Sequence, residues 1–131
     1  MSQLVNLSAL DSAARADEGA ELHVLHPATG EDLGIVIRLA GTDSAAYRRA
    51  LSAAANRRPQ AGRKKATLEE LQAENIEIMA ACTLDWSGVS LDGQSMLPFT
   101  RKDAVTLYTR FPWIREQADA FMAERAHYLQ D

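Results

Sequence analysis

Few side chains in this sequence are placed to do chemistry. His23 and His26 stand three residues apart and invite a metal-binding interpretation. On a β-strand, however, residues three apart point to opposite faces, so the two imidazoles cannot easily reach one ion. No nearby third ligand completes a recognised metal-binding pattern, because His127 is far away in the sequence. Ordinary hairpin histidines are the simpler interpretation, and we expect neither a metal nor a cofactor.

Cys82 and two aspartates are the remaining candidates for catalysis. Cys82 is the single cysteine and falls on the apolar side of an expected helix, where packing is a commoner role than nucleophilic attack. Asp85 and Asp92 flank Trp86, but the end of a helix and an Asp-Gly turn explain them more simply than paired carboxylates. The sequence also lacks a phosphate-cradling glycine loop and a nucleophile elbow. We therefore expect no catalytic residue and no enzymatic activity.

Positive charge is concentrated in one stretch of the chain. Residues 48–65 hold seven Lys and Arg and no Asp or Glu, although the whole chain carries a net charge of −4. No aromatic residue interleaves these charges for base stacking, and the pI of about 5.3 opposes a dedicated nucleic-acid binder. A solvated linker or a contact with an acidic partner is favoured, and a nucleic-acid-binding regulator stays as an alternative. The predicted basic patch consists of Arg57, Arg58, Arg63, Lys64 and Lys65.

The elements that must position these groups are one hairpin and several helices. Residues 1–20 are poor in large apolar groups and are expected to form a flexible N-terminal arm. Residues 21–40 alternate and then run β-branched around a Pro- and Gly-containing connection, which predicts a β-hairpin. We expect residues 21–131 to form a single domain with a basic linker at 59–66. The fold class is α+β, with an N-terminal β-hairpin followed by about four helices and with helix predominant.

The helix boundaries follow from capping residues and prolines. The first helix is expected to begin after Thr42 and to stop at Pro59. Thr67 and Glu70 have the spacing of a capping box, which starts a second helix that should end near Leu84. Thr100 opens a third helix, and Pro112 suits the first turn of a final one.

The segment between the second and third helices is expected to be a structured loop. It runs from Trp86 to Phe99 and contains two glycines and a proline, which disfavour helix. Large apolar side chains would anchor it by burial. The predicted structural anchors are Trp86, Phe99, Trp113 and Phe121, whereas the predicted partner-binding residues are Met122, Tyr128 and Tyr108.

Composition bears on the compartment. No apolar run approaches the roughly 18 residues that span a membrane. The first residues lack the basic start and apolar stretch of a secretory signal, and one cysteine fits a reducing compartment. We expect a cytoplasmic protein.

Several short motifs, in their joint order, resemble a known family. The strongest are Trp86-Ser87-Gly88-Val89, Leu91-Asp92-Gly93, Leu97-Pro98-Phe99-Thr100 and Pro112-Trp113-Ile114. Over roughly residues 20–130 the chain resembles the small tail assembly chaperones of long-tailed bacteriophages and prophages.

The resemblance implies a function without catalysis. Such a chaperone would bind the tape-measure protein, help to recruit tail-tube subunits during tail assembly, self-associate and be absent from the finished particle. The alternative is a structural minor tail or head–tail joining protein of a phage or prophage.

Overall fold

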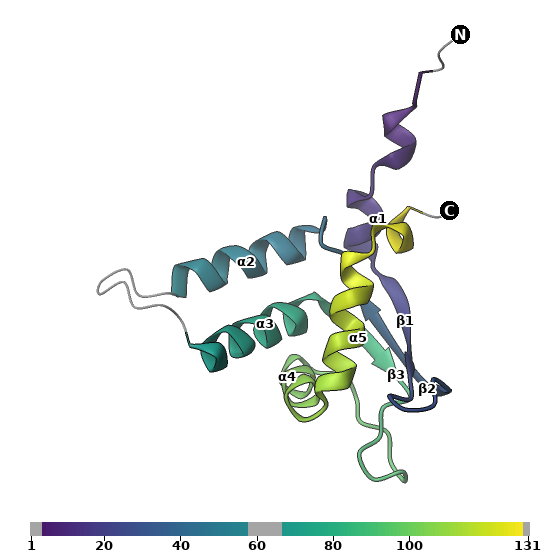
Figure 1. Ribbon diagram of the computed structural model, residues 1–131, viewed down its shortest axis with the longest axis vertical. Coiled ribbons are helices and arrows are strands. Elements are labelled where there is room, and N and C mark those ends of the chain that lie inside the picture. The colour runs from purple at the N-terminus through teal and green to yellow at the C-terminus, as the bar shows by residue number, and fades with distance from the viewer. Residues whose placement is uncertain (1–3, 58–66, 130–131) are drawn as a thin grey trace.

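A computed structural model of the protein describes residues 4–57 and 67–129. Within these ranges the fold is α+β and mostly helical, as predicted (Figure 1). The hairpin is confirmed as strands β1 (Ala20–Leu25) and β2 (Asp32–Leu39), which pair antiparallel. Four α-helices follow it in the described part of the chain: α2 (Ala45–Arg57), α3 (Leu68–Cys82), α4 (Arg101–Arg110) and α5 (Pro112–Ala123).

A third strand was not predicted. Residues 83–85 were predicted to lie at the end of a helix. Instead, α3 ends at Cys82 and the chain continues directly as β3 (Thr83–Ser87). β3 pairs antiparallel with β2, which gives the sheet order β1-β2-β3. The register shifts at Leu84, so that both Thr83 and Trp86 are buried although they are three residues apart. This bulge hides the alternation by which a half-buried strand is recognised in a sequence.

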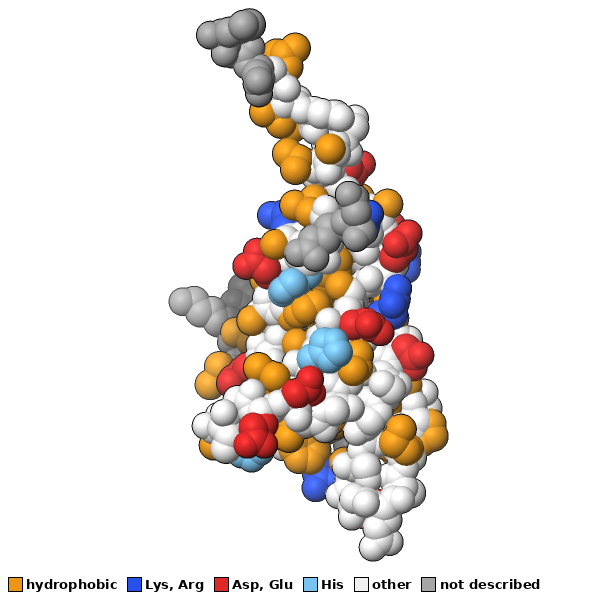
Figure 2. Space-filling model, turned by 90° about the vertical axis from the view of Figure 1, so that its right-hand side faces the viewer, with side chains coloured by type: hydrophobic (Ala, Val, Ile, Leu, Met, Phe, Trp, Pro, Cys, Tyr) orange, Lys and Arg blue, Asp and Glu red, His pale blue; other side chains and the backbone are white. Residues whose placement is uncertain are grey.

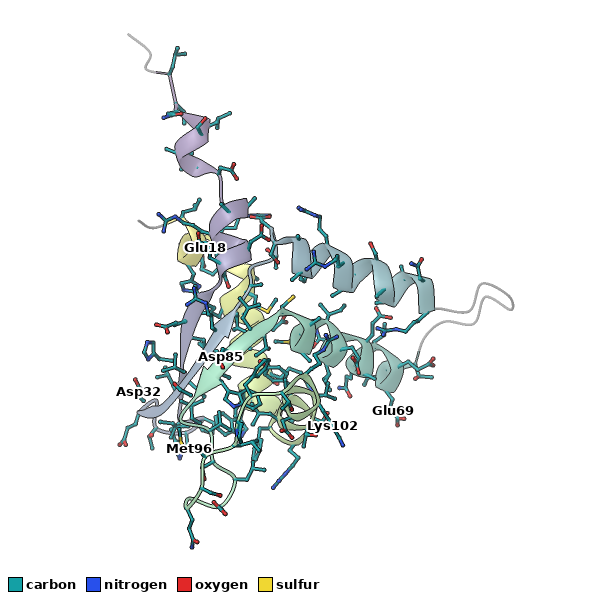
Figure 3. The ribbon with its side chains drawn as sticks, turned by 180° about the vertical axis from the view of Figure 1, so that it is seen from behind. Glu18, Asp32, Glu69, Asp85, Met96 and Lys102 are labelled. Carbon is teal, nitrogen blue, oxygen red and sulfur yellow. The ribbon has the colours of Figure 1, made fainter. Side chains whose placement is uncertain are left out.

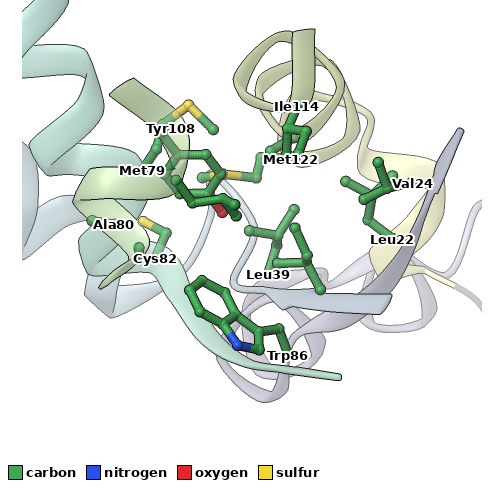
Figure 4. Close-up of a cluster of buried hydrophobic side chains, with 14 of the residues drawn as sticks. Leu22, Val24, Leu39, Met79, Ala80, Cys82, Trp86, Tyr108, Ile114 and Met122 are labelled. Carbon is green, nitrogen blue, oxygen red and sulfur yellow. The ribbon is translucent and has the colours of Figure 1, made fainter. Parts of the chain in front are cut away.

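One face of the sheet is covered and the other is open. Leu22 and Val24 on β1 are buried, whereas the residues between and beside them are exposed. The buried face packs on residues of α3, α4 and α5 and forms the main core (Figure 4). Figure 3 shows the opposite face from behind, with Asp85 of β3 on the uncovered strands.

The starts of α3, α4 and α5 follow the prediction, whereas α2 begins at Ala45, later than expected, with the Ser44 hydroxyl accepting from the Tyr47 amide. The Thr67 hydroxyl accepts from the Glu70 amide while the Glu70 carboxylate accepts from the Thr67 amide, so the capping box is confirmed. The Thr100 hydroxyl accepts from the Asp103 amide in the same way at α4. Pro112 is the first residue of α5, as predicted.

α2 and α3 form a helical hairpin that stands out from the sheet (Figure 1). Its own small core contains Ala50 and Ala54 of α2 and Ile78 of α3. Only the C-terminal half of α3 enters the main core. The predicted basic linker, residues 59–66, lies entirely outside the described residues.

The segment predicted as a flexible arm over residues 1–20 has two parts in the described structure. Residues 4–10, which include the 3₁₀ helix η1 (Leu7–Leu10), have no buried residue and extend away from the body (Figure 1). The helix α1 (Ala13–Glu18), in contrast, is docked on the body. The Gly41 amide donates to the Ala16 carbonyl at 3.0 Å, and the Ala45 amide at the start of α2 donates to the Asp17 carboxylate at 2.7 Å.

Asp43, in the turn between β2 and α2, binds segments from near both ends of the described chain. Its carboxylate accepts from the Ser12 hydroxyl, and from Arg125 in the 3₁₀ helix η2 (Arg125–Tyr128) at 2.6 and 2.9 Å. The hydrogen bonds from Arg125 and then Ser12 lower the pKa of Asp43 to about 2. A forked guanidinium–carboxylate pair fixes orientation as well as distance. The base of the residue 4–10 segment is therefore held in place.

Candidate functional site

The Trp86–Phe99 loop is built into the sheet rather than left open as a site. The Trp86 indole N–H donates to the Leu97 carbonyl at 2.8 Å, and the Phe99 ring meets the indole edge-on at 5.1 Å between centroids. Gly88 has φ +76°, and a Cβ there would lie 2.1 Å from the Gly34 carbonyl oxygen. The loop is thus fastened to β2 as well as to its own ends.

The groups considered for catalysis are occupied in structural contacts. Burial raises the pKa of the Cys82 thiol to about 11, so the thiolate is scarce at neutral pH. The Asp92 carboxylate accepts from the Gln94 and Ser95 amides, which lowers its pKa and closes the turn. Within residues 4–57 and 67–129, no group of three or more His, Cys, Asp and Glu is arranged to hold a metal ion.

The three residues predicted to bind a partner lie inside the core, which corrects their placement at a surface. Tyr108 is fully buried, and its hydroxyl lies 2.7 Å from the Thr83 hydroxyl. The Tyr128 hydroxyl donates to the Leu39 carbonyl at 3.1 Å. Met122 lies on the buried face of α5 (Figure 4). Burial raises the pKa of Tyr108 to about 12, and it also raises the pKa of Tyr128. A partner cannot touch these side chains in this conformation.

The phase of α5 explains the misplacement. Ile114, Ala118 and Met122 recur at every fourth position and form the buried stripe. Trp113 and Phe121, which sit beside that stripe, are only partly buried. Trp113 and Phe121 were predicted as anchors, and Met122 was predicted to face a partner, but it is Met122 that continues the buried stripe.

Of the predicted basic patch, the structure places one member. Arg57 is the exposed last residue of α2. Arg58, Arg63, Lys64 and Lys65 lie outside the described residues.

A shallow groove of about 830 Å³ separates the β1–β2 connection from α5 and η2. All three histidines of the chain line it, a convergence that their sequence spacing did not reveal. The His127 ring stacks on Phe121 at 3.8 Å between centroids, and the His26 Nδ1 accepts the Ala28 and Thr29 amides. Figure 2 shows this side of the molecule, with histidine and apolar side chains together on the surface.

Gln117 fastens the groove's two walls to each other. Its side-chain carbonyl accepts from the Leu25 amide at 2.9 Å, and its amide donates to the Leu25 carbonyl at 2.8 Å. This side chain therefore does for the edge strand β1 what a neighbouring strand would do at that residue.

Besides the Trp86–Phe99 loop, where Leu91 and Met96 are exposed, two other regions carry large exposed apolar side chains. On the helical hairpin, Leu68 is 72% exposed, Leu71 45% and Leu51 42%. In the segment before α1 the exposed apolar residues are Leu4, Val5, Leu7 and Leu10. These side chains contribute little to the core, and exposed apolar groups that gather on one surface are typical of interaction sites.

No helix within the described ranges is long and apolar enough to cross a membrane.

Comparison with known proteins gives one family. The family model described as YdaY prophage protein matches residues 42–131. The match begins just before α2 and takes in all the later elements, but not the β1–β2 hairpin or the segment before it. Neither the search of curated proteins nor the search of solved structures found a match.

Proposed function

Since the chain belongs to the YdaY prophage protein family, we propose that it is a tail assembly chaperone which binds the tape-measure protein in the host cytoplasm and helps to recruit tail-tube subunits. The assembly role is supported by Cys82 and Asp92, the groups considered for catalysis, because they are held in structural contacts. The motifs from Trp86 to Ile114 that resemble such chaperones all fall inside the family match.

The observation that carries the proposal is the pair of leucines at the start of α3. Leu68 and Leu71 are one turn apart, so they share a face of the helix, and both are exposed. Burying a leucine side chain is worth about 1.5–3 kcal/mol, so two on one face can anchor a partner helix. A tape-measure protein, as a long helical chain with an apolar surface, offers such a partner.

The charge around this pair adds selectivity. Glu69 and Glu70 lie between the two leucines in the sequence and are exposed. Acidic side chains beside an apolar anchor favour a partner stripe flanked by Lys or Arg, and they repel acidic helices. The surface we assign to the tape-measure protein is therefore the N-terminal part of α3.

Co-expression with the tape-measure protein of the same prophage tests the proposal. We expect the tape-measure protein to be soluble and to co-purify with this chain, and to aggregate when it is expressed alone. A tape-measure protein that is equally soluble in both cases and never co-purifies contradicts the proposal.

Mass spectrometry of purified particles separates the chaperone from a structural component. The proposal expects the chain in infected or induced cells and not in finished particles. Stoichiometric recovery from the particles would instead support a minor tail or head–tail joining protein.

A further inference from the structure

Residues 4–10 form an exposed apolar arm. They include no charged residue, and Leu4 is 98% exposed, Val5 70%, Leu7 75% and Leu10 53%. The arm leaves the body at α1 and points away from it, and Figure 2 shows hydrophobic side chains along its length. Such a concentration of large apolar groups without a core contact marks a binding segment.

The base of the arm is held in a fixed position on the body of the protein. α1 is held by the Ser12–Asp43 hydrogen bond and by the capping of α2 through Asp17. Within the arm, the Asn6 side chain accepts from the Ser8 amide and starts η1. An ordered segment on a fixed base loses less entropy on binding than a free one.

The groove between the β1–β2 connection and α5 suits this arm. Its walls include Leu22, Ala120 and Phe121, and Glu124 is the single Asp or Glu among its lining residues. An uncharged apolar segment can enter it without burying an unpaired charge of its own. Gln117 already forms hydrogen bonds with both the amide and the carbonyl of Leu25. The arm would therefore dock by its side chains rather than by adding a strand to β1.

We propose that the arm of one copy of this chain docks in the groove of a second copy, and that the exchange is reciprocal. Burying four large apolar side chains per arm, against an equal area of groove, removes roughly 1,000–1,900 Å² over the two contacts. Stable protein interfaces bury about 1,200–2,000 Å², so two arms supply what a dimer needs and one arm does not.

The arm is not expected to dock in the groove of its own chain, because it would have to reverse its direction at its base. The Asp11 carboxylate accepts from the Ala13 amide at 3.0 Å and holds the chain where it enters α1. Folding the arm back onto η2 and the groove would require the backbone to change direction beside this contact. A second copy can approach without that change.

Cross-linking between two differently marked chains tests the pairing directly. Ala9→Cys marks the arm and Thr29→Cys marks the groove, and the buried Cys82 does not compete for a maleimide. With a bismaleimide long enough to span the groove, a mixture of the two variants should give a mixed dimer at least tenfold above a mixture of Ala9→Cys with Leu91→Cys. Equal yields in the two mixtures overturn the proposal.

Sedimentation of the full chain over a range of concentrations provides the second readout. Leu7→Ser with Leu10→Ser, and separately Ala120→Arg in the groove, should each raise the dimer dissociation constant at least tenfold. Leu91→Ser, which alters a loop leucine of similar exposure (50%), should leave it unchanged. A chain that is monomeric at all concentrations, or a dimer insensitive to the arm and groove changes, refutes the exchange.

An intramolecular cross-link in dilute Ala9→Cys/Thr29→Cys chains would show that the arm closes on its own groove and would also refute the exchange. The tape-measure contact is assigned to α3 and not to the arm. The arm exchange can therefore be refuted while the proposed function holds, and the proposed function can be refuted while the arm exchange holds.

Discussion

At the scale of residues, Tyr108 and Thr83 show how a buried polar pair is satisfied. The Thr83 hydroxyl donates to the Met79 carbonyl at 2.8 Å, so its single proton is used, and Tyr108 must donate to the Thr83 oxygen. The phenol is thus paired deep in the core and needs no partner protein. Tyr108 was predicted to bind a partner, and its burial shows that the side chain instead belongs to the core.

Two glycines in one loop give a matched test of the loop's attachment. Gly88 and Gly93 have φ of +76° and +78°, but a Cβ at 88 meets the Gly34 carbonyl whereas a Cβ at 93 meets nothing within 4 Å. Gly93→Ala should therefore cost about 1 kcal/mol of unfolding free energy, from backbone strain alone. Gly88→Ala should cost about 3 kcal/mol or more, because the backbone must also move. Urea denaturation measures both, and equal costs would show that the loop is not packed on β2.

The lowered pKa of Asp43 predicts how the unfolding free energy depends on pH in the acid range. Its pKa is about 2 in the folded protein against a usual 3.8, so its ionised form stabilises the fold above pH 3.8. That contribution is lost as the pH falls through about 2. The difference in unfolding free energy between the native chain and Asp43→Asn should be constant near neutral pH and shrink between about pH 4 and 2.

Arg125→Gln provides the control for this window. It removes the largest cause of the lowered pKa, so the loss should move to higher pH in that variant. An Asp43→Asn difference that stays constant down to pH 2 contradicts the assigned role of Arg125.

At the scale of elements, the hairpin and the helix starts could be predicted because their signals are local. Thr67 and Thr100 mark the starts of α3 and α4, because each hydroxyl accepts a hydrogen bond from the amide three positions later. β3 could not be predicted, because its burial depends on the bulge at Leu84 and on pairing with β2. The groove is likewise a product of distant segments, since Gln117 and Leu25 meet across 92 positions of sequence.

The junction of α5 and β1 should depend on Gln117. Gln117→Glu keeps the size of the side chain but removes the donor to the Leu25 carbonyl and places a carboxylate beside it. We expect a loss of about 1–2 kcal/mol of unfolding free energy. Gln72→Glu, at an exposed position of α3, changes charge equally and should cost much less. Thermal unfolding compares them, and similar losses would mean that charge and not the paired hydrogen bonds matters.

At the scale of the whole molecule, we propose separate roles for three surfaces. The arm and the groove are assigned to a second copy, and the start of α3 is assigned to the tape-measure protein. The family match includes α3 and α5 but not the arm or β1. The proposed partner surface on α3 therefore lies within the part of the chain that the family model matches, whereas the arm lies outside it.

A binding titration tests the central claim, that α3 holds the tape-measure protein. Purified chain is titrated against the tape-measure protein in its native form, Leu68→Lys with Leu71→Lys, and the control Leu91→Lys. We predict that the α3 variant binds at least 100-fold more weakly while its melting temperature is unchanged, because both leucines are already in solvent. The control should bind as the native chain does. Undiminished binding by the α3 variant, or no binding by the native chain, would contradict the account.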